Sequence, residues 1–199
     1  MKQFNIMIAG AGGNNSWLLS ILSTLQRTGQ IPDDTEFTIF DGDTVEKKNL
    51  LYQDFEIVDV LENKAKVLGK RYAIKAVPKN IKKPEEFDPF DIVICGVDNK
   101  EFREMLYHYM EEHPEKYWVD LRAEGRVVAV YARHKNVSLQ ELLATLPKNS
   151  TDPTSCQLSY ELDNGIIQLG NRIAANIGAQ YLLNYIRGEE NPPSFIHMF

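Results

Sequence analysis

The chain has 199 residues, of which 43% are hydrophobic and 25% charged, and its formal net charge is -6. This is the composition of an ordinary globular protein, and the length is enough for one domain with its own core. The negative charge argues against a protein whose main activity is to coat nucleic acid.

Cysteine content and hydropathy exclude further classes of protein. The two cysteines, Cys95 and Cys156, lie far apart in the sequence, which excludes a disulfide framework and a four-cysteine zinc site. No apolar run is long enough to span a bilayer, and strand residues begin almost at the N-terminus, which leaves no room for a signal sequence. We therefore expect a cytoplasmic protein.

A glycine-rich turn joins the first predicted strand to the first predicted helix. The apolar run 4–9 leads into Gly10, Gly12 and Gly13, and an amphipathic helical pattern follows directly. Such glycines let backbone N–H groups approach a phosphate, and the positive end of the helix points to the same place. A turn that serves only close packing of helix on strand is the alternative.

The second predicted strand, residues 36–40, ends at Asp41. Strand, helix and strand at this spacing predict a right-handed βαβ unit and a parallel sheet. An acidic residue at this strand end is where a dinucleotide-type fold binds a ribose, although Asp-Gly is also a common turn. The spacing from Gly13 to Asp41 exceeds the roughly 20 residues of the usual dehydrogenase unit, which disfavours a nicotinamide cofactor.

A lysine-rich helix is predicted over residues 57–75, followed by a short strand over 76–81. Lys66 and Lys70 are four residues apart and share one face, which is typical of a solvated helix surface. Lys64 lies off that face. One lysine of this group is expected to bind phosphate.

The clearest later strand is the nearly continuous apolar run 91–99, which is typical of a parallel strand buried on both faces. It places Asp98 at the carboxyl edge of the sheet, where open α/β sheets bind ligands. Cys95 is predicted to be a core residue. A helix over 100–112 and strands over 117–121 and 125–131 follow, the last of them antiparallel.

The segment 147–165 has no periodicity and carries Cys156. A loop of this length in a compact domain tends to be functional or mobile. A lone cysteine is a slow nucleophile unless its pKa is lowered, so a covalent role for Cys156 stays open. A helix beginning at about 166 or 172 and ending at 187 precedes an apolar tail, 191–199, that we expect to make some contact.

Several short motifs follow one another along the chain. They are the strand and glycine turn, Asp41-Gly42-Asp43-Thr44-Val45, Asn49-Leu50-Leu51-Tyr52-Gln53, Asp59-Val60-Leu61-Glu62-Asn63-Lys64-Ala65, and Val97-Asp98-Asn99 with Arg103. In this order they resemble the ThiF/MoeB-like superfamily of ubiquitin-activating-type adenylating enzymes. The resemblance extends from Ile6 to about Arg187, and Cys156 falls where that family has its cysteine-bearing loop. The expected fold is a single Rossmann-like, doubly wound domain over 1–199, mostly parallel with antiparallel C-terminal strands.

The resemblance implies an enzyme that binds ATP and Mg²⁺ and adenylates the C-terminal carboxylate of a small ubiquitin-like or sulfur-carrier protein. Asp41 would hold the ribose, Lys64 would neutralise phosphate charge, and Asp98 would bind magnesium. A thiol or sulfur donor would then attack the acyl-adenylate, a step in which Cys156 is the candidate. The residues implied at the nucleotide are Gly10, Gly12, Gly13, Asp41, Asn49, Gln53 and Lys64.

The chain also departs from the family pattern. Tyr52 replaces the usual arginine, which removes a permanent charge and a bidentate phosphate contact. Asn15 replaces a glycine of the turn, and its side chain takes room near the phosphates. The paired CxxC zinc knuckles are absent, and no counterpart of the N-terminal arginine segment of homodimeric relatives precedes the first strand.

These departures leave three functions open. The first is the adenylating enzyme, with the lost charge replaced by one of four arginines. The second is a catalytically weakened module that binds a nucleotide or a ubiquitin-like protein, and the distant third is an NAD-dependent oxidoreductase. We also expect a homodimer, because Trp17, the Tyr181–Tyr185 helix face and the tail supply more apolar surface than a small sheet needs. The four arginines are Arg71, Arg103, Arg122 and Arg126.

Overall fold

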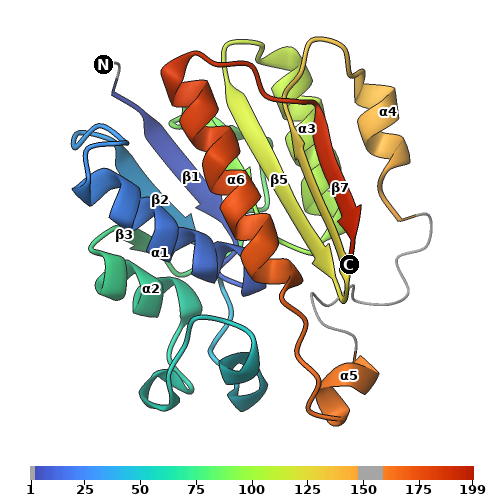
Figure 1. Cartoon of the computed structure of the whole chain (residues 1–199). Coiled ribbons are helices and arrows are strands. Elements are labelled where there is room, and N and C mark those ends of the chain that lie inside the picture. Colours follow the sequence, from blue (N-terminus) through green and yellow to red (C-terminus); the bar gives the residue numbers. More distant parts are fainter. Residues whose placement is uncertain (1–2, 148–158) are drawn as a thin grey trace.

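The computed structural model describes residues 3–147 and 159–199, which form one seven-stranded sheet flanked by helices (Figure 1). The strand order is β3-β2-β1-β4-β5-β6-β7. The first five strands of the chain are parallel to one another, whereas β6 pairs antiparallel with β5, and β7 antiparallel with β6. This confirms the predicted fold class. The strands are β1 (Asn5–Ala9), β2 (Glu36–Phe40), β3 (Lys75–Val77), β4 (Ile92–Cys95), β5 (Tyr117–Glu124), β6 (Val127–Ala132) and β7 (Ser194–Met198).

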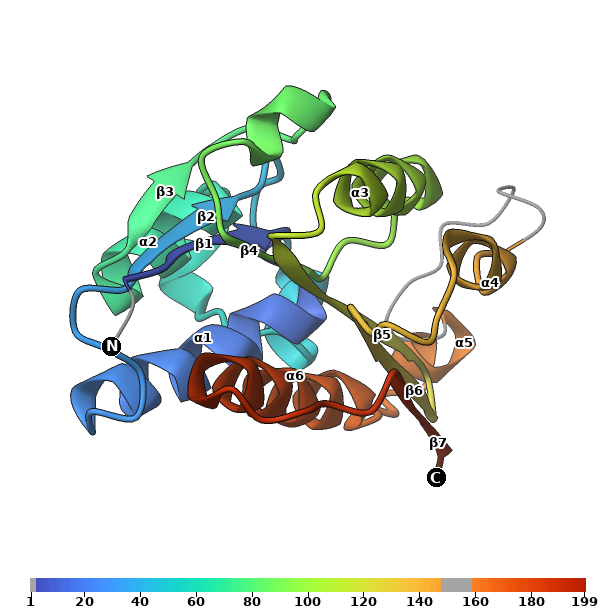
Figure 2. The same ribbon diagram turned by 90° about the horizontal axis from the view of Figure 1, so that it is seen from above.

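Helices cover both faces of the sheet (Figure 2). The helices α1 (Gly13–Arg27), α2 (Lys64–Tyr72) and α6 (Gly170–Arg187) lie on one face, and α3 (Lys100–Glu112) and α4 (Leu139–Ala144) lie on the other. The short α5 (Ser159–Asp163) lies beyond the carboxyl edge of the parallel strands, at the bottom of Figure 1. Within the described ranges, no helix is long and apolar enough to cross a membrane.

The central strands are apolar on both faces because they separate two cores. In β1, Ile6 and Ile8 pack on the side of α1 and α6, whereas Met7 and Ala9 pack on the side of α3. The same alternation holds in β4, where Cys95 lies on the α3 side and is fully buried. Two-sided burial explains the continuous apolar runs of the sequence and confirms Cys95 as a core residue.

The predicted helix over 57–75 is wrong in its first half. Residues Ile57–Asp59 form only a 3₁₀ turn, Leu61 has a φ of 76°, and α2 begins at Lys64. The Asn63 side chain accepts a hydrogen bond from the Lys66 N–H at 3.0 Å and so caps the helix at this point. The following strand is also shorter than predicted, because β3 ends at Val77.

The apolar surface from which a dimer was expected is largely internal. Trp17 donates its indole N–H to the Tyr52 carbonyl and stacks under Arg172, Tyr181 is buried, and Tyr185 stacks on Tyr117 at 3.9 Å. These aromatic side chains therefore fill contacts within the chain. The apolar tail, by contrast, forms the edge strand β7 and stays exposed.

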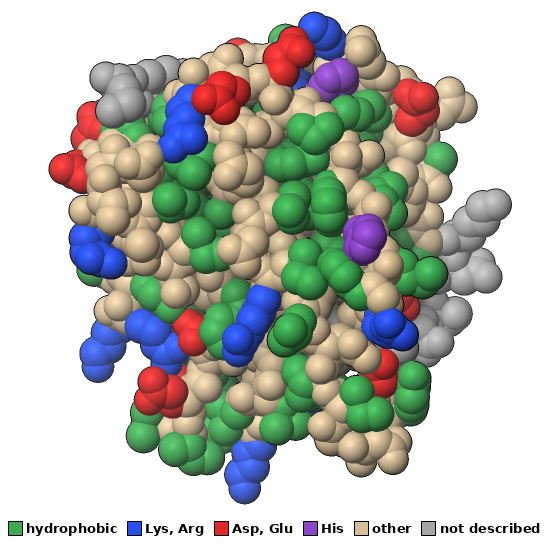
Figure 3. Space-filling view, in the orientation of Figure 1, with side chains coloured by type: hydrophobic (Ala, Val, Ile, Leu, Met, Phe, Trp, Pro, Cys, Tyr) green, Lys and Arg blue, Asp and Glu red, His purple; other side chains and the backbone are tan. Residues whose placement is uncertain are grey.

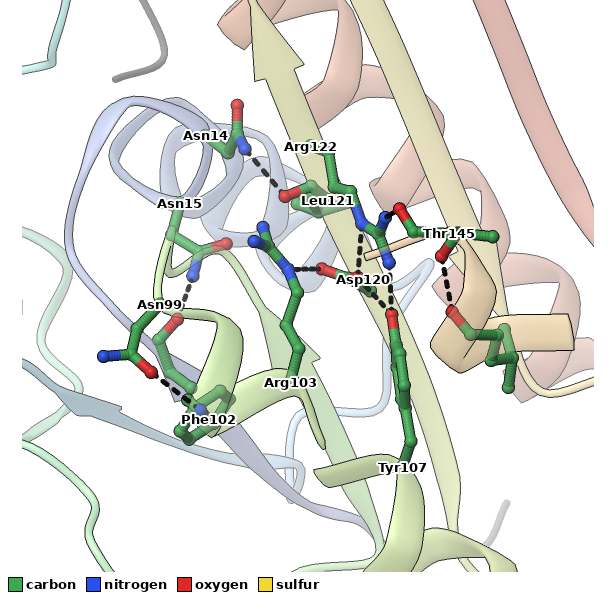
Figure 4. Close-up of polar contacts among 12 residues, drawn as sticks. Asn14, Asn15, Asn99, Phe102, Arg103, Tyr107, Asp120, Leu121, Arg122 and Thr145 are labelled. Atoms are coloured by element: carbon green, nitrogen blue, oxygen red, sulfur yellow. Dashed lines mark hydrogen bonds and ion pairs between the residues drawn. The ribbon is translucent and has the colours of Figure 1, made fainter. Parts of the chain in front are cut away.

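A buried charge cluster ties α3 to β5 and to the end of α4 (Figure 4). Asp120 is fully buried and accepts hydrogen bonds from Arg103 Nε at 3.1 Å, Arg122 Nε at 2.8 Å and the Tyr107 hydroxyl. Arg122 also donates to the Thr145 carbonyl at 2.9 Å. Burial alone would raise the pKa of Asp120, but the two guanidinium groups outweigh it and lower this pKa to about 2.

We predict that Asp120→Asn destabilises the fold at neutral pH by about 3–5 kcal/mol, because it leaves two buried guanidinium groups without their counter-charge. Because the pKa of Asp120 falls from 3.8 to about 2 on folding, its contribution is complete above about pH 4 and is lost as the pH falls towards 2. Urea unfolding at several pH values measures both effects. The control is Asp88→Asn at an exposed carboxylate, and an equal loss in the two variants would contradict the prediction.

Candidate nucleotide site

A cavity of about 770 Å³ opens at the carboxyl ends of β1, β2 and β4. Strand order reverses between β1 and β4, since β1 is followed by β2 on one side and β4 lies on its other side. Ligands of open α/β sheets bind at such a switch point. The loops after the three strands bring most of the predicted site residues to this cavity: Gly10, Gly12, Gly13, Asp41, Asn49, Gln53, Lys64 and Asp98 all line it.

The glycine turn after β1 forms one wall. Gly10 has a φ of +87°, a backbone conformation that side-chain-bearing residues rarely adopt. Gly12 is the N-cap of α1 and supplies no side chain to accept from the first-turn N–H groups, and the space beside its Cα is open. Gly13 packs against the Asn171 side chain, where an added Cβ would come within 2.3 Å. Gly12 is therefore the glycine that leaves the positive end of α1 open to an anion.

Asp41 directly follows β2, and its carboxylate joins the turn after β1 to the turn after β2. Its Oδ2 accepts a hydrogen bond from the Ala11 N–H at 2.6 Å, and its Oδ1 accepts one from the Asp43 N–H at 2.8 Å. Burial raises the pKa of this carboxyl above its usual value, although both N–H groups act in the opposite direction. Each carboxylate oxygen can accept a second hydrogen bond, which is the chemistry that binds a hydroxyl pair.

Lys64 is the first residue of α2 and is only 7% exposed. Its Nζ lies 3.6 Å from Asp43 Oδ2, and its backbone N–H donates to the Asp43 carbonyl. A cation at the positive end of a helix is electrostatically unfavourable unless an anion is close. Lys66 and Lys70 are exposed, as the sequence predicts.

Another wall of the cavity comes from the 3₁₀ turn Lys47–Leu51 and the residues after it. Asn49 is buried, and its Oδ1 accepts from the Glu46 N–H at 2.9 Å, which fixes the turn. Tyr52 is 8% exposed, and its hydroxyl lies 3.4 Å from Asn49 Nδ2. Gln53 has a buried amide oxygen with no partner in the structure. These side chains give the wall polar groups that a bound ligand could use.

Asp98 follows β4 and faces the same cavity. The side chain that caps α3 is that of Asn99, which accepts from the Phe102 N–H at 2.7 Å. The N-cap of α3 is therefore Asn99, the residue after Asp98.

Sequence reasoning missed two features of the cavity. The lining includes several large apolar side chains, and two further lysines, Lys48 and Lys82, line the cavity with Lys64. Lys82 lies in the loop after β3, and its place after a parallel strand could have predicted that it lines the cavity. The apolar residues come from the end of β2, the loops after β3 and β4, and α3, and no local pattern reveals that they meet: Phe40, Ile81, Val97, Phe102 and Met105.

The arginines expected to replace the missing charge lie elsewhere. Arg71 binds Asp59 at 2.6 Å and also contacts Asp54, whereas Arg103 and Arg122 both bind Asp120. None of these three lines the described cavity, and neither does Arg126. Cys156 falls outside the residues that the structure describes.

Asn15 packs inward and does not line the cavity. It is fully buried, and its Nδ2 donates to the carbonyls of Ala9 and Gly10 at 2.8 and 2.9 Å. Its amide fills the space beside Gly96, where an added Cβ would come within 2.5 Å. The expectation that Asn15 crowds a phosphate is therefore wrong, because the side chain joins the ends of β1 and β4.

Comparison with known proteins places the fold. The sequence model of the ThiF family matches residues 1–198. Escherichia coli MccB with ATP aligns with a TM-score of 0.70 at 15% identity, covering 98% of this chain and 60% of MccB. MccB with AMPCPP and MccA aligns with a TM-score of 0.70 at 16% identity, covering 98% of this chain and 61% of MccB. PaaA aligns with a TM-score of 0.69 at 14% identity, covering 99% of this chain and 61% of PaaA. No curated protein matches the chain. The similarity to the solved structures shows a shared fold, and this chain spans about three-fifths of their length.

We predict that Gly96→Ala and Asn15→Ala compensate for one another. Alone, Gly96→Ala overpacks the space beside Asn15 and should cost about 1–3 kcal/mol, and Asn15→Ala should cost a similar amount through its lost hydrogen bonds. In the double variant the methyl group added at Gly96 fills the vacated space, so the loss should be smaller than the sum by about 1 kcal/mol or more.

Urea unfolding measures this coupling. Gly12→Ala is the control, because its new Cβ meets open space, and it should cost less than about 1 kcal/mol. Strictly additive losses in the double variant would contradict the packing described.

Proposed function

The chain belongs to the ThiF family, and from this premise we propose that it uses ATP to adenylate the C-terminal carboxylate of a small protein. The observation that carries the proposal is the cavity at the switch point, which combines the open end of α1 with Asp41, Lys64 and Asp98. The fold it shares with MccB, a protein solved with ATP, supports the choice of nucleotide.

The proposed orientation of ATP follows the chemistry of the cavity walls. The adenine would lie against the apolar lining residues, and its ribose hydroxyls would donate to Asp41. The phosphates would lie against Gly12 and the first turn of α1, with Asn49 and Gln53 as further hydrogen-bonding partners. Lys64 would then lie beside the α-phosphate, where negative charge develops.

In the proposed reaction, a carboxylate oxygen of the substrate attacks the α-phosphorus as the bond to the pyrophosphate oxygen breaks. The products are an acyl-adenylate and pyrophosphate. This chain's contribution is to orient the two reactants in line and to place fixed positive groups around the phosphorus, so that no reorganisation is needed during the reaction.

The residues present fit a magnesium ion. Mg²⁺ in nucleotide sites is usually held by one or two carboxylates together with phosphates and water. Asp98 supplies such a carboxylate in the cavity, and the described part of the chain has no group of three or more His, Cys, Asp or Glu side chains that could hold a metal ion without the nucleotide. When bound, the ion would neutralise phosphate charge.

We propose a ubiquitin-like or sulfur-carrier protein as the substrate, on the strength of the family alone. Cys156 remains the candidate to accept the acyl group or to handle sulfur. MccB is solved with MccA as well as with nucleotides, which supports a nucleotide and a second molecule meeting at this fold. We also propose a homodimer.

ATP–pyrophosphate exchange in the presence of candidate small β-grasp proteins tests the function. We expect exchange with such a partner, and ATP should bind at least tenfold more tightly than NAD, a difference of about 1.4 kcal/mol. Calorimetry that found NAD bound as tightly as ATP would reject the adenylation proposal.

Two lysines of one helix provide the matched variants for this assay. Lys64→Ala removes the buried cation of the cavity and should lower exchange about 100-fold. Lys66→Ala removes an exposed cation two residues away and should leave exchange within about twofold of the wild type. Equal rates in the two variants would remove Lys64 from the proposed site.

Tyr52 favours a second candidate function, a nucleotide-binding module without catalysis, because it supplies no permanent charge. We expect the enzyme instead, since Lys82 also lines the cavity and can supply positive charge, whereas Lys48 is paired with Glu46 at 3.0 Å. Tyr52→Arg should then leave exchange unchanged or lower it, because the new guanidinium must be desolvated at a site only 8% exposed.

The opposite result would identify the binding module. A wild type silent with every partner, together with a Tyr52→Arg variant that gains exchange by about tenfold or more, would mean that one charge-assisted contact was missing. As a control that the cavity is intact, calorimetry should show that both proteins bind ATP.

A further inference from the structure

A second cavity, of about 540 Å³, lies at the amino end of β2, whereas the nucleotide cavity lies at the carboxyl end of the same strand. Its walls are the carboxyl end of α1, the loop that leads into β2, and the residues that join α2 to β3. No described residue lines both cavities. A volume of this size is within the range of small-molecule sites, so the second cavity is large enough to bind a ligand of its own.

Opposite charges line this second cavity without neutralising one another. Arg27 and Lys75 are the basic side chains of its lining, and Asp33 and Glu36 are the acidic ones. All four are exposed, and within residues 3–147 and 159–199 none of them makes an ion pair. Acidic and basic side chains both reach the surface at the left margin of Figure 3, where α1 ends in the orientation of Figure 1. A small molecule that carries one positive and one negative group can pair with both kinds of side chain at once.

A buried hydroxyl of the same lining lacks a hydrogen-bond partner. Thr35 is only 4% exposed, and its Oγ1 contacts no donor or acceptor in the described part of the chain. A hydroxyl can donate one hydrogen bond and accept others, and burying it unpaired costs free energy. A ligand in the cavity that supplies a polar group to Thr35 accounts for this position.

The loop that carries these groups is fixed by hydrogen bonds. Gln26 Nε2 donates to the carbonyls of Thr35 at 3.0 Å and Asp33 at 3.3 Å. The Glu36 N–H donates to the Phe4 carbonyl at 2.9 Å, which ties the loop to the first strand of the sheet. A wall that is already ordered avoids part of the entropy cost of binding.

Two helix ends and two apolar side chains complete the cavity. The helix α1 ends at Arg27, and α2 ends at Tyr72 with Ala73 as its C-cap, so residues at the carboxyl ends of both helices lie in the lining. The carboxyl end of a helix carries partial negative charge and favours a cation such as an ammonium group. Phe37 and Ile74 supply apolar surface beside these polar groups.

We propose that this cavity binds a free α-amino acid with an apolar side chain. The carboxylate of the amino acid would pair with the two basic side chains and accept a hydrogen bond from Thr35. Its ammonium group would lie between Asp33 and Glu36, near the helix ends, and its side chain would pack on Phe37. An acid alone or an amine alone would leave half of the charged lining without a counter-charge, which is why the structure favours a zwitterion.

Calorimetry with three matched compounds tests the ligand class. We expect the full chain to bind L-leucine, and to bind leucinamide and isocaproate at least about tenfold more weakly, because each analogue lacks one of the two charges. The measurement requires no ATP, so its result is independent of the proposed adenylation. A wild type that does not bind leucine, or that binds either analogue as tightly as leucine, would overturn the proposal.

Paired variants locate the site. Arg27→Gln and Glu36→Gln each remove one exposed charge of the lining and should weaken leucine binding about threefold. The matched controls are Arg126→Gln and Glu124→Gln, which remove exposed charges outside the cavity and should bind leucine as the wild type does. Lining variants that bind leucine no more weakly than the controls would place the site elsewhere and so overturn the assignment.

Thr35→Val separates a binding role of Thr35 from a structural one. Without ligand, the variant should have a higher urea midpoint than the wild type, because it no longer buries an unpaired hydroxyl. Its affinity for leucine should fall about tenfold, since the carboxylate loses a charge-assisted hydrogen bond. Thr35→Ser keeps the hydroxyl and should restore the affinity, and circular dichroism checks that each variant is folded. Unchanged leucine affinity in Thr35→Val would contradict the proposal.

Discussion

The cavity depends on one carboxylate that joins two loops. Asp41 accepts hydrogen bonds from the N–H groups of Ala11 and Asp43, so the end of β2 is tied to the turn after β1. The same loop is joined to α2, because Asn63 Nδ2 donates to the carbonyls of Asp41 and Asp43. The end of α1, the Asp41 turn and Lys64 therefore keep fixed positions around one space, which is the pre-organisation that electrostatic catalysis requires.

The arginines of the buried cluster and the lysines of the cavity lie in different environments. Arg103 and Arg122 are buried on Asp120, where a planar guanidinium can satisfy several acceptors at once. The cations that line the cavity are lysines, whose compact ammonium groups suit phosphate oxygens as point charges. With a tyrosine at residue 52, the cations that line the described cavity are all lysines.

Sequence patterns located most of the fold and the cavity but placed element boundaries less well. The apolar runs of β1 and β4 are long and buried on both faces, so their strands and their order were evident. The start of α2 was misplaced, because the predicted helix included Asn63, whose side chain caps the observed helix. The tail was not predicted to be a strand, because β7 is stabilised by pairing with β6 and not by a local pattern.

The sequence by itself determined which segments meet at the cavity, because Gly10, Gly12, Asp41, Lys64 and Asp98 follow strands or begin helices and are brought together by parallel topology. Only the tertiary structure decided which polar side chains face the cavity. Asn15 and the arginines bind other parts of the chain, whereas two unexpected lysines line the wall. Side-chain direction depends on which buried partner each group finds, and partners distant in sequence leave no local pattern.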